Sequence, residues 1–197
     1  MIRRPIKSLR NDRRGNVLIE FAFVAPVLLT FTFAGFDLGY RTYIQSTLQG
    51  TVEKAGRDAT LEGGPAALSS IDARVYSTVH PLVDQGEFTF TRKNYETFSR
   101  AGQAENFTDG NNNGIRDAGE CFQDENGNHT WDTDSGSEGA GGARDIVVYT
   151  AKVKYARLFP MYGLLGWSQD QTLTATTVLR NQPYATQSAR NVVAVCT

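Results

Sequence analysis

The longest apolar stretch of the chain, residues 17–36, constrains its fold more than any other feature, because Glu20, Thr30 and Thr32 are its only polar residues. Twenty residues in a helix are about 30 Å long, the thickness of the hydrocarbon core of a bilayer. Six basic residues lie within residues 3–14, before the stretch. This asymmetry predicts a membrane anchor with a cytoplasmic N-terminus and an exported remainder.

Two other structures compete with an anchor. The stretch could be a buried core helix, although its length and basic flank disfavour that interpretation. It could also be a secretory signal that is cleaved behind its apolar region, and Thr32-Phe33-Ala34 is a mediocre version of the cleavage pattern.

A glycine and a glutamate distinguish this stretch from an ordinary anchor. Gly15 ends the basic leader, and Glu20 follows it by five residues, inside the apolar run. This pattern resembles the type IV prepilin signal. The resemblance implies that a prepilin peptidase cuts after Gly15 on the cytoplasmic side and leaves Asn16 as the new N-terminus of an intact helix.

The chemistry of Glu20 agrees with that implication. A carboxylate in hydrocarbon costs about 3 kcal/mol or more, so it should find a partner or become protonated. We expect the new α-amino group of Asn16, in this or a neighbouring subunit, to be that partner, which makes Glu20 an assembly residue. The alternative is that Glu20 lies near the membrane surface and reaches water.

Helical periodicity continues beyond the membrane. It predicts one helix over residues 16–61, which Gly63-Gly64-Pro65 ends, and a second helix that stops before Pro81. The apolar faces of the two helices consist of Ile44, Leu48, Val52, Ala55 and Ala59, and of Leu68, Ile71, Val75 and Val79.

Three later segments alternate in the manner of strands, near residues 87–90, 147–155 and 173–179. The expected fold class is therefore α+β: a long N-terminal helix packed on a small antiparallel sheet, as in pilins. We expect a basic leader (1–15), a transmembrane and extended helix (16–61) and an exported head (62–197) that carries an acidic insertion (105–142).

Composition excludes some functions. The formal net charge of −1 gives no general attraction for nucleic acid. The two histidines, His80 and His129, lie near no nucleophile motif, and no phosphate-binding glycine motif or zinc spacing occurs. The sequence therefore predicts a protein that is not an enzyme.

The acidic insertion contains the calcium-loop spacing of the EF-hand. Oxygen ligands at alternate residues, a glycine at the sixth position and a closing glutamate at the twelfth are suited to Ca²⁺. Gly114 is at the sixth position, and Ile115 would contribute its backbone carbonyl. The side-chain ligands would be Asp109, Asn111, Asn113, Asp117 and Glu120. A solvated turn region is the alternative.

A second segment repeats the pattern less completely. His129 replaces the glycine, and Ser135 stands where the closing carboxylate belongs. Its candidate ligands are Asp124, Asn126, Asn128 and Asp132. Helices of EF-hand type are not evident around either loop, so a bound ion would fold a loop and would not switch a helix pair.

Two cysteines, Cys121 and Cys196, are the only ones in the chain. In an exported head an even number favours a disulfide, which would join the acidic insertion to the end of the chain. Two unrelated thiols remain the alternative.

A further apolar group follows the second of the strand-like segments. Tyr162, Leu164, Leu165 and Trp167 could belong to the core or form a contact surface, and we favour the core.

The stretch "NVLIEFAFVAPVLLTFTFAGFDLGY", the helices after it, and "KYARLFPMYGLLGW" followed by "LTATTVLRNQPY" resemble the TadE and TadG group of tight-adherence (Flp) pilus proteins. Members of that group have a final strand that ends in an Arg-Asn-x-Pro-like turn, here residues 180–183. The resemblance implies a minor pilin or pseudopilin in the bacterial inner membrane. Its implied partners are a prepilin peptidase and other pilus subunits or assembly-platform proteins.

One alternative function is a membrane-tethered, calcium-binding adhesin or envelope protein that never enters a filament. A tethered hydrolase would need a catalytic pair, which the sequence does not contain.

Overall fold

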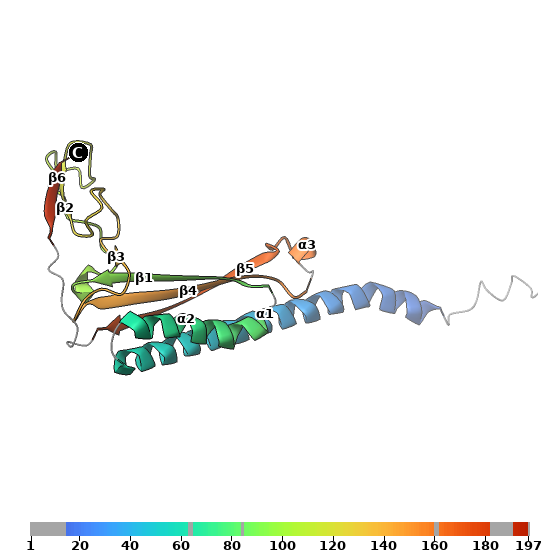
Figure 1. The fold of residues 1–197 in the computed structure, drawn as a ribbon. Coiled ribbons are helices and arrows are strands. Elements are labelled where there is room, and N and C mark those ends of the chain that lie inside the picture. Colours follow the sequence, from blue (N-terminus) through green and yellow to red (C-terminus); the bar gives the residue numbers. More distant parts are fainter. Residues whose placement is uncertain (1–14, 63–64, 84, 160–161, 182–190, 197) are drawn as a thin grey trace, which may run out of the picture. The chain divides into compact units, whose positions relative to one another are not determined.

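A computed structural model describes residues 15–62, 65–83, 85–159, 162–181 and 191–196. The predicted basic leader up to residue 14 and the predicted turn at Gln182-Pro183 lie outside these ranges. The helices are α1 (Asn16–Glu62), α2 (Pro65–Val79) and the short α3 (Tyr162–Leu165) (Figure 1). The strands are β1 (Glu87–Tyr95), β2 (Cys121–Asp124), β3 (Ser137–Glu138), β4 (Ile146–Ala156), β5 (Asp170–Arg180) and β6 (Val193–Cys196). The α+β class is confirmed.

The chain forms two compact units, which divide α1 between them. One unit holds α1 up to Tyr43 together with residues 156–170, and the other holds Ile44–Tyr155 and the chain from Gln171 onward. The predicted domain boundaries at residues 15 and 61 stay a prediction.

The first part of α1 is an apolar helix with most of its side chains exposed. The described residues contain one helix that is long and apolar enough to cross a membrane, within residues 16–57, with a mean hydropathy of 2.1 in its most apolar window. Thr30 Oγ1 donates to the carbonyl of Pro26 at 2.7 Å, and Thr32 Oγ1 donates to that of Leu28 at 2.8 Å. Because both hydroxyls are satisfied within the helix, they add little cost in lipid. The segment is consistent with a single-pass membrane anchor.

The second part of α1 packs on the sheet. The predicted apolar face is buried at Ile44, Leu48, Val52 and Ala55. Gln45 Nε2 donates to the carbonyl of Thr174 in β5 at 2.9 Å, which places this part of the helix over β5.

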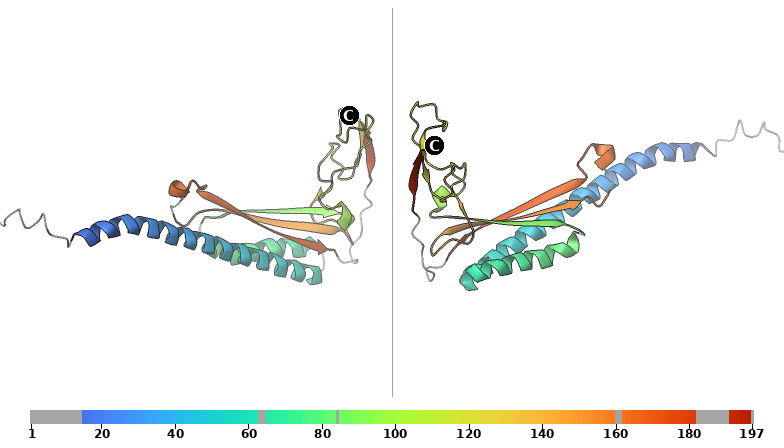
Figure 2. Two further views of the ribbon diagram at one scale, coloured as in Figure 1. Left: turned by 180° about the vertical axis from the view of Figure 1, so that it is seen from behind. Right: turned by 45° about the horizontal axis from the view of Figure 1, so that its top comes forward.

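Helix α2 packs on the same sheet. Its predicted apolar residues Ile71, Val75 and Val79 are buried. Tyr149 Oη in β4 donates to Asp72 Oδ1 at 2.8 Å. Burial, and then this hydrogen bond to Asp72, raises the pKa of Tyr149. Figures 1 and 2 show α2 beside the second part of α1 along one face of the sheet.

The main sheet has the strand order β3-β1-β4-β5. Strand β1 is antiparallel to β3 and to β4, with Phe88 opposite Val153 and Phe90 opposite Ala151. The predicted alternation is confirmed. Phe88 and Phe90 in β1 and Thr177 in β5 are half-buried. The other inward residues are buried: Val147, Tyr149, Ala151, Val153 and Tyr155 in β4, and Leu173, Ala175 and Leu179 in β5.

Three short strands were not predicted. Strand β3 lies in the glycine-rich part of the insertion and pairs with β1, while β2 and β6 form a second, two-stranded sheet. In that sheet Cys121 is directly opposite Cys196, and the two are joined by a disulfide. The predicted disulfide is therefore present.

Candidate functional site

The N-terminal candidate residues lie at the beginning of α1. Gly15 precedes the helix and accepts a hydrogen bond at its carbonyl from Ile19 N at 3.3 Å. Gly15, Asn16 and Glu20 are all exposed. Among the described residues, no other side chain forms a hydrogen bond or an ion pair with Glu20.

The first acidic loop closes around Asp109. Asp109 Oδ1 accepts from Asn113 N at 3.2 Å and Oδ2 accepts from Gly114 N at 2.7 Å, the fifth and sixth loop positions. Asn111 and Asn113 both donate through Nδ2 to Asp117 Oδ2 at 2.7 Å. The Gly114 N–H, ahead of other backbone N–H groups, holds the pKa of Asp109 below its ordinary value. The five predicted side-chain ligands of this loop therefore converge, because Glu120 Oε2 also accepts from Asp117 N at 2.9 Å.

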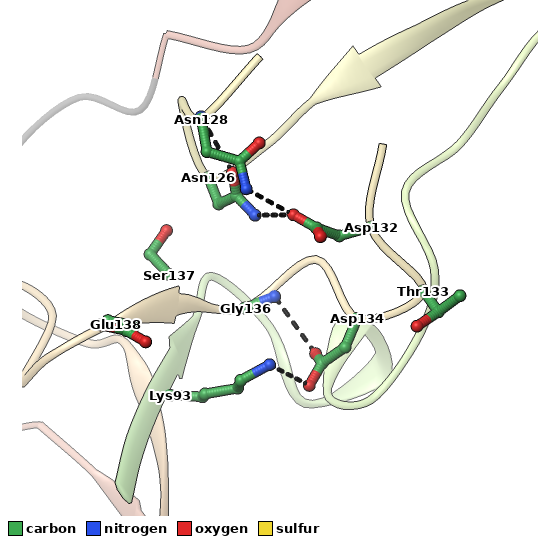
Figure 3. Close-up of a pocket in the computed structure, with 9 residues that line it drawn as sticks. All are labelled: Lys93, Asn126, Asn128, Asp132, Thr133, Asp134, Gly136, Ser137 and Glu138. Carbon is green, nitrogen blue, oxygen red and sulfur yellow. Dashed lines mark hydrogen bonds and ion pairs between the residues drawn. The ribbon is translucent and has the colours of Figure 1, made fainter. Parts of the chain in front are cut away.

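The second loop repeats these hydrogen bonds position by position. Asp124 Oδ1 accepts from Asn128 N at 3.2 Å and Oδ2 accepts from His129 N at 2.9 Å. Asn126 and Asn128 donate through Nδ2 to Asp132 Oδ2 at 2.7 and 2.6 Å (Figure 3). The structure thus brings together the four predicted ligands of the second loop as well.

The backbones of the two loops match too. Residues at the fourth and sixth positions have positive φ in both: 58° at Asn112 and 76° at Gly114, and 79° at Gly127 and 61° at His129. A non-glycine residue adopts this conformation at a cost, and polar residues tolerate it best. His129 therefore fills the position that the sequence pattern reserves for glycine.

The closing carboxylate of the second loop is Glu105, which sequence reasoning did not identify. In the first loop Glu120 accepts from Gly110 N at 2.8 Å and from Asp117 N at 2.9 Å, the second and ninth positions. In the second loop Glu105 accepts from Glu125 N at 2.9 Å and from Asp132 N at 3.1 Å, which are again the second and ninth positions.

Strand pairing explains how Glu105 reaches this place. The segment before the first loop pairs with β2 through an antiparallel bridge between Phe107 and Phe122. Two residues further along each strand from that bridge, this register sets Glu105 opposite Asp124 and Asp109 opposite Glu120. Each loop therefore has an aspartate at its first position facing a glutamate across one strand pair.

Ser135, at the twelfth position of the second loop, does not take the place of that glutamate. Its backbone N–H donates to the carbonyl of Gln103 at 2.8 Å, and its side chain is buried. No local sequence signal points to Glu105, because it precedes the loop that it closes and approaches through long-range pairing.

The two loops differ in burial. In the second loop Asp124 and Glu105 are each 1% exposed, whereas the asparagines of the first loop are exposed. Among the described residues, the basic side chain nearest to the Asp124 carboxylate is His129, whose Nδ1 lies 3.3 Å from Oδ2. Nearby, Lys93 Nζ donates to Asp134 Oδ2 at 2.7 Å in the same pocket as Asn126, Asn128 and Asp132 (Figure 3).

The atoms that could bind a metal ion in both loops are carboxylate, amide and backbone oxygens. Hard cations such as Ca²⁺ prefer these ligands. Within the described residues no group of three or more His, Cys, Asp or Glu side chains is arranged to hold a metal ion. The Asn amide nitrogens contact Asp117 and Asp132, so an ion would have to replace these contacts.

Comparison with protein families gives one result, for the N-terminal part. Residues 15–57 match the family model described as TadE-like protein, which confirms the predicted resemblance over the apolar helix. The match leaves the acidic loops and the sheet outside it. No match to a curated protein or to a solved structure was found.

Proposed function

We propose that this chain, whose residues 15–57 match the TadE-like model, is a minor-pilin-like or pseudopilin-like component of tight-adherence (Flp) pilus assembly. It is held in the bacterial inner membrane by α1, with its N-terminus in the cytoplasm, and it associates with other pilus subunits through that helix. The family match carries the proposal, because it covers the apolar helix that, alone among the described residues, is long enough to span a membrane. On this proposal its role is structural and not catalytic.

Maturation is the first step of the proposed route. A prepilin peptidase cuts after Gly15 and frees the α-amino group of Asn16, which becomes a cation close to Glu20. The exposure of Gly15 and Glu20 supports this step. Mass spectrometry of the protein extracted from membranes tests it, and the expected N-terminus is Asn16. An N-terminus at Met1 would support a plain anchor, and one near Gly35 would support a secreted protein.

We also propose that the two acidic loops bind Ca²⁺, one ion each. Asp109, Asn111, Asn113, Asp117 and Glu120 would hold the first ion, with the carbonyl of Ile115. Asp124, Asn126, Asn128, Asp132 and Glu105 would hold the second. The repeated hydrogen bonds of the two loops support this proposal, since the oxygens of each loop converge from the same positions.

A cation would offset the repulsion among carboxylates in this insertion and the cost of burying Asp124 and Glu105.

Terbium provides a direct test, because it replaces Ca²⁺ and emits when a nearby tryptophan is excited. Trp131 lies within the second loop, and its Nε1 donates to the carbonyl of Glu105 at 3.0 Å. We expect terbium emission on excitation of Trp131 that Ca²⁺ abolishes by competition. Absence of that emission would contradict the second site.

Limited proteolysis tests both loops together. A chelator should leave the main sheet intact but expose residues 105–142 to cleavage. Equal protection with and without the chelator would argue against calcium.

A membrane-tethered, calcium-binding adhesin or envelope protein is the second candidate function. The loop pair favours it, because the loops lie outside the family match and could recognise a surface independently of a filament. The two functions differ in the N-terminus: an adhesin of this kind would keep Met1, and the pilin route produces Asn16.

A further inference from the structure

We propose that the described residues of the connection between β4 and β5, 158–159 and 162–167, lie in the membrane interface beside α1 and contact lipid. This inference rests on the proposed anchoring of α1 and adds a second membrane-contacting element to it. Four observations on the unit formed by the first part of α1 and residues 156–170 carry the inference.

The connection is attached to α1 at the outer end of the apolar run. The ring of Phe159 stacks on that of Phe33, with centroids 5.3 Å apart, and its centroid is 6.2 Å from that of Phe36. Phe33 and Phe36 are three residues apart and so share one face of the helix. The contact therefore falls in the last turn of residues 17–36.

An ion pair fixes the same contact. Arg157 Nη1 pairs with Asp37 Oδ2, and Asp37 is the first charged residue after the apolar run. Asp37 is 4% exposed. Arg157 Nε also donates to the carbonyl of Ser168 at 2.8 Å, and its guanidinium carbon lies 4.9 Å from the centre of the Trp167 ring. The pair thus holds Trp167 at this level of the helix and neutralises the charge beside it.

The connection itself has no charged residue between Leu158 and Trp167. Leu158 is 61% exposed and Leu165 is 37% exposed, so neither leucine is buried in a core, whereas Tyr162 and Trp167 are half-buried. Tryptophan and tyrosine are typical of membrane interfaces, because their rings are apolar and their polar atoms can reach water. Tyr162 and Trp167 are residues of these two types.

The level along the helix agrees with an interface. Residues 17–36 extend over about 30 Å of helix, so a segment attached at Phe33 and Phe36 lies where the hydrocarbon core ends. A neighbouring protein helix could cover the same residues. Lipid is favoured because Phe36, beside which the ring of Phe159 lies, and Phe31 are both exposed apolar side chains of the helix.

Tryptophan quenching by brominated lipids tests the inference in the full chain reconstituted into phosphatidylcholine vesicles. Trp131→Phe leaves Trp167 as the only tryptophan, and the matched variant Trp167→Phe leaves Trp131. We expect lipids brominated near the headgroup end of the acyl chain to quench Trp167 more than lipids brominated near its methyl end. Trp131 should keep its emission in both. Replacing Leu158 and Leu165 with glutamate should reduce the quenching of Trp167.

Vesicle flotation separates the possible failures. If the protein floats with the vesicles but Trp167 emits as strongly as in unbrominated lipid, the anchor stands and this inference is wrong. If the protein does not float, both the anchor and this inference are wrong. Circular dichroism of each variant checks that the fold is retained.

Discussion

At the residue scale, Glu105 and Ser135 decide whether the second loop resembles the first. In the sequence, Ser135 stands where the closing carboxylate of the loop is expected. In the structure, Glu105 accepts the hydrogen bonds that such a carboxylate would accept. Because Glu105 is buried and accepts from two backbone N–H groups of the second loop, it would be a ligand only of the second ion.

Glu105→Gln should therefore abolish terbium emission excited through Trp131 while retaining calcium binding at the first loop. Glu120→Gln should have the opposite effect: calorimetry should detect loss of one ion, and Trp131-sensitised emission should persist. Glu96→Gln, at an exposed position outside the insertion, is the control and should bind as the original protein does. Retention of emission by Glu105→Gln would show that this carboxylate is not a ligand.

Tyr149 provides a second prediction at this scale. Its hydroxyl is buried and donates to Asp72, so the folded protein keeps it protonated above the ordinary tyrosine pKa of about 10. The unfolded chain loses that proton as the pH rises past about 10, while the folded chain keeps it. Stability is therefore greatest below that pH and falls above it.

We expect Tyr149→Phe to lose about 1 kcal/mol of unfolding free energy at neutral pH, because it removes one hydrogen bond. The difference between the original protein and this variant should shrink as the pH rises above about 10. Denaturant unfolding in detergent at increasing pH measures it. A difference that stays constant would contradict the assignment of the pKa to this hydroxyl.

At the element scale, two glycines of α1 differ in how closely the sheet approaches them. A Cβ at Gly56 would lie 2.7 Å from Leu179 Cδ2 and 3.2 Å from Thr177 Cγ2, whereas a Cβ at Gly50 would have no neighbour within 4 Å. Both positions lie inside α1.

Gly50→Ala should stabilise the protein by up to about 1 kcal/mol, because alanine favours the helix over glycine. Gly56→Ala should be less stable than Gly50→Ala by about 1–3 kcal/mol, since the new methyl group overpacks the contact with β5. Thermal unfolding of the pair measures this difference. Equal melting temperatures would show that α1 does not pack closely on β5 at Gly56.

The long elements were predictable, and the short ones were not. Ile44, Leu48 and Val52 recur at a helical period, and residues 147–155 alternate over a whole strand, so both patterns indicate their structures locally. Strands β2, β3 and β6 have four, two and four residues, too few for a period to be recognised. Their pairing depends on contacts far apart in the sequence, as does the position of Glu105.

At the scale of the whole molecule, the family match divides the chain into a part that it covers, residues 15–57, and a part that it does not cover. The apolar helix matches the TadE-like model, and the acidic loops lie outside that match. The proposal assigns membrane anchoring and assembly to the first part and calcium binding to the second. Removal of calcium should therefore leave the chain anchored in the membrane through α1.

Glu20 tests the assembly role most directly, because it is the only charged residue within residues 17–36. The measurement is crosslinking and co-purification of Glu20→Ala with other pilus subunits from membranes of cells that express the complete system. Glu53→Ala is the control, since Glu53 is exposed on the same helix beyond the apolar run. The account predicts that Glu20→Ala stays in the membrane and loses its association with the other subunits, while Glu53→Ala keeps it. Undiminished co-purification of Glu20→Ala would contradict the proposed role of the helix in assembly.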